Sequence, residues 1–122
     1  MEPRIIAVVD DEETVRFATS SLLRSMGYRC TTFPSAVALI EQGFDGVDCI
    51  CSDIQMPGMT GLELASVLAR TPGSPPLVLM TAYADDYVAA TSQAFGVTAL
   101  LEKPLVADLL IEAVEAALGA PV

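Results

Sequence analysis

Short apolar runs alternate along the chain with segments whose apolar residues recur at helical spacing. The runs, at 5–9, 28–33, 47–52, 77–81 and 97–101, have little polar alternation. They are therefore typical of strands covered on both faces. The segments after them, 12–26, 35–42, 61–70, 84–94 and 106–118, predict helices. Five such repeats predict an α/β fold with a doubly wound parallel sheet and helices on both sides.

Turn and capping residues set the expected limits of these helices. Gly27 and Gly96 follow the first and fourth helices, where a left-handed residue ends a helix most easily. Ser35 and Thr60 are predicted N-caps. The Pro-Gly-Ser-Pro-Pro stretch at 72–76 cannot continue the third helix. The last helix is expected to bury one apolar face, made of Leu109, Leu110, Ala113, Val114, Ala117 and Leu118.

The 122 residues are expected to form one domain over 1–122, either stand-alone or the N-terminal part of a longer protein. An apolar share of 52% favours a globular fold over disorder. No apolar run reaches the roughly 18–20 residues that a bilayer crossing needs. The N-terminus has no signal-peptide pattern. We therefore expect a cytoplasmic protein that does not bind membranes.

Charge and cysteine usage narrow the function classes. Sixteen acidic and six basic residues give a formal charge of −10, so direct binding of nucleic acid is not expected. Cys49 and Cys51 flank one residue on a predicted buried strand, and Cys30 is the third cysteine. With no histidine in the chain, a thiolate metal site lacks further ligands, and the cysteines are interpreted as small core residues.

Chemically active side chains stand where the predicted strands end. The first strand ends in Asp10 and Asp11, the third in Asp53, the fourth in Thr81, and the fifth leads to Lys103, the only lysine. In doubly wound sheets the binding crevice lies at the carboxyl ends of the strands, so these groups are expected to meet there. A strand-ending aspartate alone is more often a turn residue, but this joint placement indicates a site.

The chemistry of this group points to phosphoryl transfer assisted by a metal. Clustered carboxylates in a partly buried pocket require a compensating cation, and Mg²⁺ prefers carboxylate, water and phosphate oxygens. With that charge in place, an aspartate oxygen can attack phosphorus in line and form an aspartyl phosphate. Lys103 would add positive charge, and Thr81 would donate a hydrogen bond to a phosphoryl oxygen.

Four motifs in this order resemble the receiver domain of two-component response regulators, over nearly the whole chain. They are Val-Val-Asp10-Asp11-Glu12, Asp53-Ile-Gln-Met-Pro57-Gly58-Met-Thr-Gly61, Met80-Thr81-Ala82 and Lys103-Pro104. The resemblance implies a flavodoxin-like (βα)5 fold with strand order 2-1-3-4-5.

The resemblance also implies a role for each site residue. Asp53 is the phosphoacceptor, Asp11 a direct Mg²⁺ ligand, and Asp10 a ligand acting mainly through metal-bound water. Asp53 and the backbone carbonyl of Gln55 complete the metal site. Lys103 and Thr81 contact the phosphoryl group. The peptide bond from Lys103 to Pro104 is cis, and the small Ala82 leaves room for the phosphoryl group.

The implied function is a phosphorylation-dependent switch rather than a turnover enzyme. A histidine kinase or phosphotransfer protein would load Asp53. The face made by the loop after the fourth strand, the fifth strand and the last helix would then control an output domain or downstream protein. A phosphorylation-dependent homodimer on that face would have to be apolar, using Val88, Leu100 and Leu105, because the last helix carries only acidic charges.

Two positions depart from the family pattern or bear on the lifetime of the phosphorylated state. Leu100 stands three residues before Lys103, where receivers usually carry a Tyr or Phe that rotates inward. It is interpreted either as a tolerated core substitution or as a sign that Thr81 and the following loop transmit the signal, with Tyr83 or Tyr87 as the moving ring. Tyr83 either shields the phosphoryl group from water or lies exposed.

Three other functions fit parts of the sequence. A metal-dependent phosphohydrolase with an aspartate nucleophile often has a second Asp two residues later, where this chain has Gln55. A receiver-like interaction module without phosphorylation is expected to have lost an acid, the hydroxyl or the lysine, and all are present. A flavodoxin-like cofactor binder is expected to have a Gly-rich phosphate loop after the first strand, which is absent here.

Overall fold

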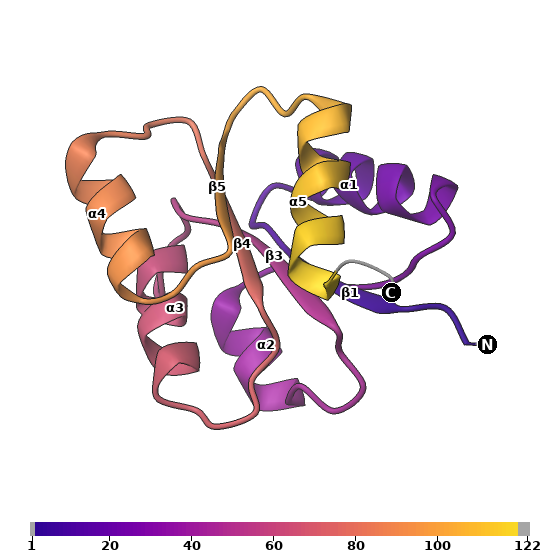
Figure 1. The fold of residues 1–122 in the computed structure, drawn as a ribbon, viewed down its shortest axis with the longest axis horizontal. Coiled ribbons are helices and arrows are strands. Elements are labelled where there is room, and N and C mark those ends of the chain that lie inside the picture. The colour runs from indigo at the N-terminus through magenta and orange to yellow at the C-terminus, as the bar shows by residue number, and fades with distance from the viewer. Residues whose placement is uncertain (1, 120–122) are drawn as a thin grey trace.

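Strands and helices alternate along residues 2–119, the part of the chain that the computed structural model describes (Figure 1). The strands are β1 (Ile5–Val9), β2 (Arg29–Phe33), β3 (Cys49–Asp53), β4 (Leu77–Thr81) and β5 (Ala99–Glu102). The helices are α1 (Glu13–Ser25), α2 (Ala36–Gln42), α3 (Gly61–Ala69), α4 (Asp86–Ala94) and α5 (Ala107–Leu118). All strand pairs are parallel and the order is β2-β1-β3-β4-β5, which confirms the predicted topology.

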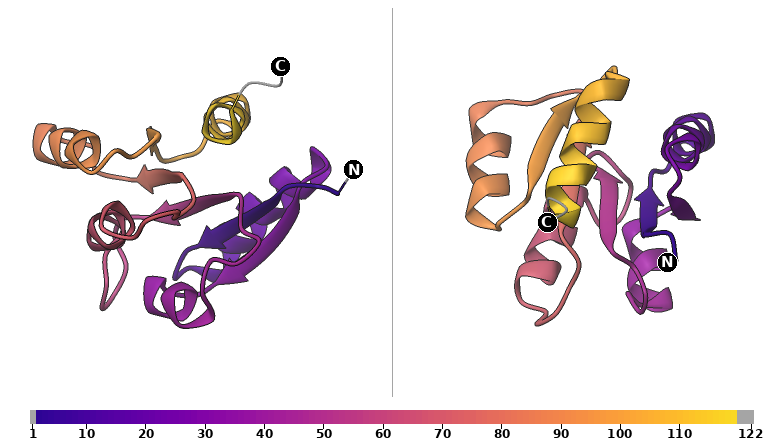
Figure 2. Two further views of the ribbon diagram at one scale, coloured as in Figure 1. Left: turned by 60° about the horizontal axis from the view of Figure 1, so that its bottom comes forward. Right: turned by 45° about the vertical axis from the view of Figure 1, so that its right-hand side comes forward.

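One apolar cluster lies on each face of the sheet. Alternate residues of β1, β3 and β4 point to opposite sides, as the pleat of a strand requires. Ala7, Ile50 and Leu79 pack in the cluster covered by α2, α3 and α4. Val8 and Val78 pack in the cluster covered by α1 and α5. The sheet therefore lies between two helical layers, and the left view of Figure 2 shows α5 and α2 on its two sides.

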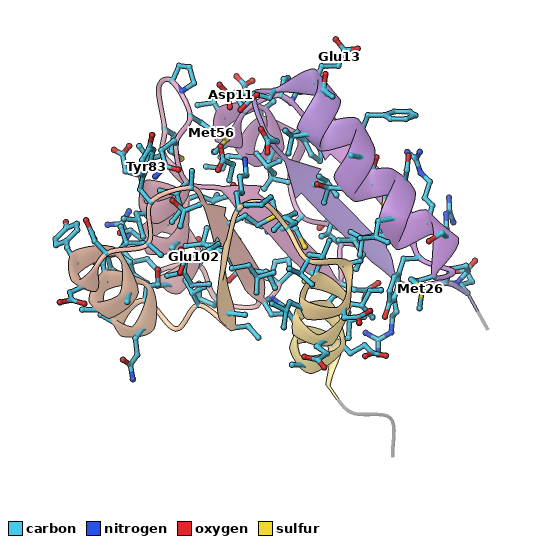
Figure 3. All side chains as sticks on the ribbon, turned by 90° about the horizontal axis from the view of Figure 1, so that it is seen from above. Asp11, Glu13, Met26, Met56, Tyr83 and Glu102 are labelled. Atoms are coloured by element: carbon cyan, nitrogen blue, oxygen red, sulfur yellow. The ribbon has the colours of Figure 1, made fainter. Side chains whose placement is uncertain are left out.

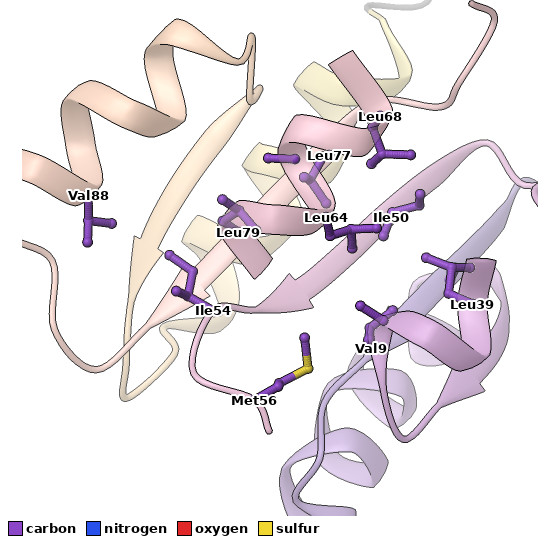
Figure 4. Packing of buried hydrophobic residues seen from close by; sticks show 13 residues of the cluster. Val9, Leu39, Ile50, Ile54, Met56, Leu64, Leu68, Leu77, Leu79 and Val88 are labelled. Carbon is purple, nitrogen blue, oxygen red and sulfur yellow. The ribbon is translucent and has the colours of Figure 1, made fainter. Parts of the chain in front are cut away.

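Helix α3 anchors the loop that follows β3. Its buried Leu64 and Leu68 pack with Ile50 of β3 and with Ile54 just after that strand (Figure 4). A capping box starts the helix: the Thr60 side chain accepts from the Glu63 amide, and the Glu63 carboxylate accepts from the Thr60 amide. The Ser35 and Thr60 caps are therefore confirmed, Ser35 by the hydrogen bond that its side chain accepts at the start of α2. Among residues 2–119 no helix has the length and apolar character of a membrane span.

Strands β3 and β5 begin two residues later than predicted, at Cys49 and Ala99 rather than at 47 and 97. The apolar residues at the two predicted starts, Val47 and Val97, donate their amides to carbonyls of the preceding turns. The Val47 amide donates to the Phe44 carbonyl, and the Val97 amide donates to the Ser92 carbonyl. Each is therefore held in a turn and cannot join the ladder.

The predicted apolar face of α5 is wrong at one position. Leu110, Ala113 and Val114 are buried, whereas the Leu109 side chain is 50% exposed. Neighbouring residues on a helix point about 100° apart, so the Leu109 side chain turns away from the core that holds Leu110.

The cysteines are core residues, as predicted. Cys49 and Cys51 are fully buried in the cluster under α1 and α5, and Cys30 packs against that cluster. All three are free thiols. Burial raises the pKa of Cys30. The thiol of Cys49 and burial together raise the pKa of Cys51, so both Cys30 and Cys51 are held as thiols rather than as reactive thiolates.

Gly61, the first residue of α3, touches the backbone of β3 so closely that a side chain has no room. A Cβ atom there would lie 2.5 Å from the Asp53 carbonyl oxygen and 2.9 Å from the Ile54 Cα. The Gly61 amide also donates to the Ile54 carbonyl at 3.0 Å. Gly61 therefore sets the distance between α3 and the end of the strand that carries Asp53.

We predict that Gly61→Ala lowers the free energy of unfolding by about 1–3 kcal/mol, because the added methyl must displace backbone atoms. Helix propensity alone predicts the opposite sign, a gain of up to about 1 kcal/mol from replacing glycine by alanine. Urea unfolding of both proteins measures the difference. A more stable variant would contradict the close packing of α3 on β3.

Candidate functional site

A cavity of about 280 Å³ opens at the carboxyl ends of the central strands. Its lining consists of Asp11, Glu12, Asp53, Gln55, Ala82, Tyr83 and Lys103. Figure 3, seen over this edge, places Asp11, Met56 and Tyr83 along the same side of the molecule. Parallel pairing brings these segments together, because β1 and β4 both flank β3 and β5 pairs with β4. The predicted convergence of strand ends is therefore present.

Three carboxylates gather beside this cavity. Asp10, Asp11 and Asp53 each offer an oxygen, and these atoms lie within 4.8 Å of one another. Asp10 and Asp53 are buried, whereas Asp11 is exposed. Closely spaced carboxylate oxygens are the donor set that hard divalent cations prefer. The cluster is therefore compatible with a metal site.

Asp10 is held by three separate contacts. Its Oδ1 accepts from the Glu12 amide at 3.0 Å, and its Oδ2 accepts from Lys103 Nζ at 3.3 Å. The Arg16 guanidinium donates to the Asp10 backbone carbonyl at 2.7 Å. Both carboxylate oxygens of Asp10 thus already have donors, which fixes its side chain.

Lys103 stands between two buried carboxylates. Its Nζ lies 3.3 Å from Asp10 Oδ2 and 3.3 Å from Asp53 Oδ1. Burial alone would lower the pKa of Lys103, but the charges of Asp10 and Asp53 outweigh burial and raise it. The Lys103 amide donates to the Thr81 carbonyl at 2.8 Å, and the peptide bond to Pro104 is cis, as the resemblance implied. The ammonium is therefore fixed in place and charged.

Asp53 is 3% exposed and is the last residue of β3, not the first after it. Burial is the main cause that raises the pKa of this carboxyl; the charge of Lys103 opposes it and the charge of Asp10 adds to it. Within the described part of the chain, Asp53 Oδ1 has no hydrogen-bond donor. Its contact with Lys103 has ion-pair distance without hydrogen-bond geometry. One buried oxygen of Asp53 is thus left with unused acceptor capacity.

Thr81 lies fully buried at the end of β4 and belongs to a short hydrogen-bond chain. Its hydroxyl donates to Gln55 Oε1 at 2.9 Å and accepts from the Tyr83 amide at 3.0 Å. The ring of Tyr83 is 73% exposed although the residue lines the cavity. Ala82 lies between Thr81 and Tyr83, is exposed, and also lines the cavity.

Leu100 lies outside the cavity, on the sheet face covered by α2, α3 and α4. It is partly buried against that cluster, and in the β4–β5 ladder it stands opposite Leu79. Val88 of α4 is buried in the same cluster, at 8% exposure, so it cannot supply surface for a dimer as the sequence analysis expected. Leu105 is partly buried against the opposite cluster.

Sequence reasoning missed the side chain of Gln55. The resemblance implied a metal-binding role for its backbone carbonyl but no hydrogen bond between its side chain and Thr81, whereas in the structure its amide oxygen accepts a hydrogen bond from the Thr81 hydroxyl. Arg16, which holds the Asp10 carbonyl, was also missed. A polar residue two positions after Asp53 was visible in the sequence, but its partner lies 26 residues away on the neighbouring strand.

The sequence and the fold are similar to those of known response regulators. The family described as "Response regulator receiver domain" matches residues 6–115. FixJ, a transcriptional regulatory protein of Azorhizobium caulinodans, is 35% identical over 93% of this chain and 54% of its own length. NtrC of Escherichia coli, a DNA-binding transcriptional regulator, is 33% identical over 98% of this chain and 26% of its own length. The chain therefore spans about half or less of these relatives.

Solved structures give the same result. The crystal structure of FixJ-N matches with a TM-score of 0.88 at 29% identity, covering 100% of this chain and 98% of that one. The response regulator StyR matches with a TM-score of 0.86 at 32% identity, over 95% of this chain and 59% of that one. With a fold, a strand order and a sequence shared along nearly its whole length, the chain belongs to the receiver domains of two-component response regulators, which are signalling domains rather than turnover enzymes.

Proposed function

We propose that this receiver is switched by phosphorylation of Asp53, supplied by a histidine kinase or phosphotransfer protein and assisted by Mg²⁺. The observation that carries the proposal is the state of the Asp53 carboxylate. One of its oxygens is buried, lacks a hydrogen-bond donor in the described chain, and lies 3.3 Å from the Lys103 ammonium. A buried carboxylate oxygen normally has hydrogen-bond donors, whereas this oxygen has only its contact with Lys103, so a lone pair is left for attack on phosphorus.

The residues present fit a divalent cation. Asp11, Asp53 and the backbone carbonyl of Gln55 would hold it, with Asp10 contributing through water. The raised pKa of Asp53 supports this assignment, because burial and the nearby Asp10 disfavour its ionised form without a further positive charge. When bound, Mg²⁺ would offset the negative charge of both the carboxylates and the phosphoryl oxygens.

The side chains of the chain itself would carry the transfer. An Asp53 oxygen forms the new bond to phosphorus as the bond from phosphorus to the donor breaks, and the leaving atom keeps that electron pair. Lys103 is already charged and aimed at the site, so it would stabilise charge on the phosphoryl oxygens without moving far. The Thr81 hydroxyl would donate a hydrogen bond to a phosphoryl oxygen.

The conformational signal would pass through Thr81 and the loop after β4 rather than through an aromatic ring at position 100. Leu100 has no ring to rotate, and its side chain packs on the core. The Tyr83 amide is bonded directly to the Thr81 hydroxyl, so a movement of Thr81 would release the start of this loop. The exposed rings of Tyr83 and Tyr87 would change position with it.

The partner of the switched face is an output domain or a downstream protein. The relatives FixJ and NtrC are named as transcriptional regulators, and this chain covers only part of each. The domain itself, with its formal charge of −10, would not contact nucleic acid directly. A homodimer formed on phosphorylation would use exposed apolar groups such as Tyr87, Val106 and Leu109 in place of Val88.

Incubation with Mg²⁺ and a small phosphodonor such as acetyl phosphate tests the central claim. Intact mass spectrometry is expected to show one added phosphoryl group on the wild type and none on Asp53→Ala. Asp45→Ala, which removes an exposed acid elsewhere, is the matched control and should be loaded like the wild type. An unmodified wild type, or loading of Asp53→Ala, would overturn the proposal.

Asp53→Asn is expected to stabilise the protein when divalent ions are removed with EDTA. The folded-state pKa of Asp53 is raised, so its stabilising contribution is complete at low pH and is lost as the pH rises through that pKa. The asparagine variant escapes this loss. Its advantage in urea unfolding should be largest near neutral pH and shrink toward the ordinary aspartate pKa of 3.8. Asp45→Asn, at an exposed acid with the same change of charge, is the control, and an equal gain in both variants would contradict this expectation.

Tyr83→Ala is expected to speed loss of the phosphoryl group, because the ring lines the cavity beside Asp53 and would screen it from water. Tyr87→Ala is the control, since Tyr87 is equally exposed but does not line the cavity. The decay of the phosphorylated protein, followed by mass after removal of the donor, gives both rates. If Tyr83→Ala decays at the wild-type rate, Tyr83 does not shield the site.

A further inference from the structure

The hydroxyl of Thr81 already acts both as a hydrogen-bond donor and as a hydrogen-bond acceptor. Thr81 is fully buried, and a threonine hydroxyl has one proton to donate. That proton goes to Gln55 Oε1 at 2.9 Å, while the oxygen accepts from the Tyr83 amide at 3.0 Å. The bond to Gln55 also ties the loop after β3 to the end of β4. Thr81 is therefore held between the loop on the Asp53 side and the loop on the α4 side.

We infer that the side chain of Gln55 competes with the phosphoryl group for the proton of Thr81. The inference rests on the function proposed above, in which Thr81 donates that proton to a phosphoryl oxygen. Because only one proton is available, the bond to Gln55 and the bond to the phosphoryl group exclude each other. Gln55 is thus a positioning residue, which acts through Thr81 and favours the unphosphorylated conformation.

The competition links the loading of Asp53 to the loop before α4. Turning the hydroxyl from Gln55 toward the cavity also alters the lone pair that holds the Tyr83 amide. The hydrogen bond from the Tyr83 amide is then weakened, so the release of Gln55 is coupled to the start of the β4–α4 loop. Such a coupled step gives the chain a route for its signal that does not need an aromatic residue at position 100.

The strength of this restraint should be modest. Gln55 is exposed as a residue, so water can replace Thr81 as the partner of its amide, whereas the buried Thr81 hydroxyl depends on Gln55. A neutral hydrogen bond of this kind shifts an equilibrium by about fivefold, which corresponds to about 1 kcal/mol. The hydrogen bond to Gln55 therefore lowers the population of the phosphorylated conformation modestly, without preventing its formation.

Binding of beryllium trifluoride in the presence of Mg²⁺ isolates this effect, because its fluorine atoms stand in for phosphoryl oxygens and no bond to the donor has to break. Gln55→Met keeps the length of the side chain and the backbone carbonyl but removes the acceptor. Dissociation constants are measured for the wild type, Gln55→Met, Thr81→Val and the double variant. Thr81→Ala replaces Thr81→Val if the valine variant does not fold, as judged by circular dichroism.

We expect Gln55→Met to tighten binding by about fivefold when Thr81 is present. In the Thr81→Val background the same substitution should have no effect, because there is no hydroxyl proton to compete for. A role of Gln55 in loop structure alone would change the affinity equally in both backgrounds, so this dependence on Thr81 separates the two explanations.

Gln55→Glu provides the conservative counterpart, since a carboxylate can only accept. Its charge should weaken binding in both backgrounds, but it should weaken binding more when the Thr81 hydroxyl is present. Looser binding by Gln55→Met, or an equal change with and without the hydroxyl, would overturn the inference while leaving the proposed function intact. A wild type that binds no beryllium trifluoride would instead overturn the proposed function, and the inference with it.

Discussion

The Lys103 ammonium, placed 3.3 Å from both Asp10 and Asp53, is the interaction on which the site depends. Asp10, Asp11 and Asp53 have oxygens within 4.8 Å of one another. Without a cation among them, these carboxylates would repel one another strongly. Lys103 supplies one positive charge beside three carboxylates, and the pKa of Asp53 is raised mainly by burial and further by the charge of Asp10. The folded chain therefore keeps a deficit of positive charge at the point where a divalent cation and a phosphoryl group would bind.

The parallel sheet makes this arrangement possible because it separates packing from chemistry. Side chains within β1, β3 and β4 are buried on both faces and hold the strands in register. Their carboxyl ends meet at one edge, where backbone contacts such as Gly61 against Asp53 fix the distances. The core thus defines the positions of the site residues.

Apolar runs and strand ends are local signals, so the sequence was sufficient to predict a parallel α/β sheet and the convergence of Asp10, Asp53, Thr81 and Lys103. The strand order was implied only by the resemblance to receiver domains, and the structure confirms it. The sequence was not sufficient where tertiary contacts decide. The apolar pattern predicts Val47 and Val97 to be strand residues, but their amides donate hydrogen bonds within turns instead. The exposure of Leu109 depends on how α5 is rotated against the sheet. The hydrogen bond between Gln55 and Thr81 joins residues far apart in sequence, so no local pattern predicts it.

Because Lys103 is the only lysine, the switch centre also holds the only side-chain amine of the chain. Its side chain is 17% exposed and lines the cavity, but its raised pKa keeps the amine protonated, so reaction with an electrophile should be slow. Acylation of this amine would cancel its charge and leave Asp10 and Asp53 facing each other without a counterion. Under the proposed function, acylation of this single lysine would therefore disable switching, and no other lysine of the chain would compete for the reagent.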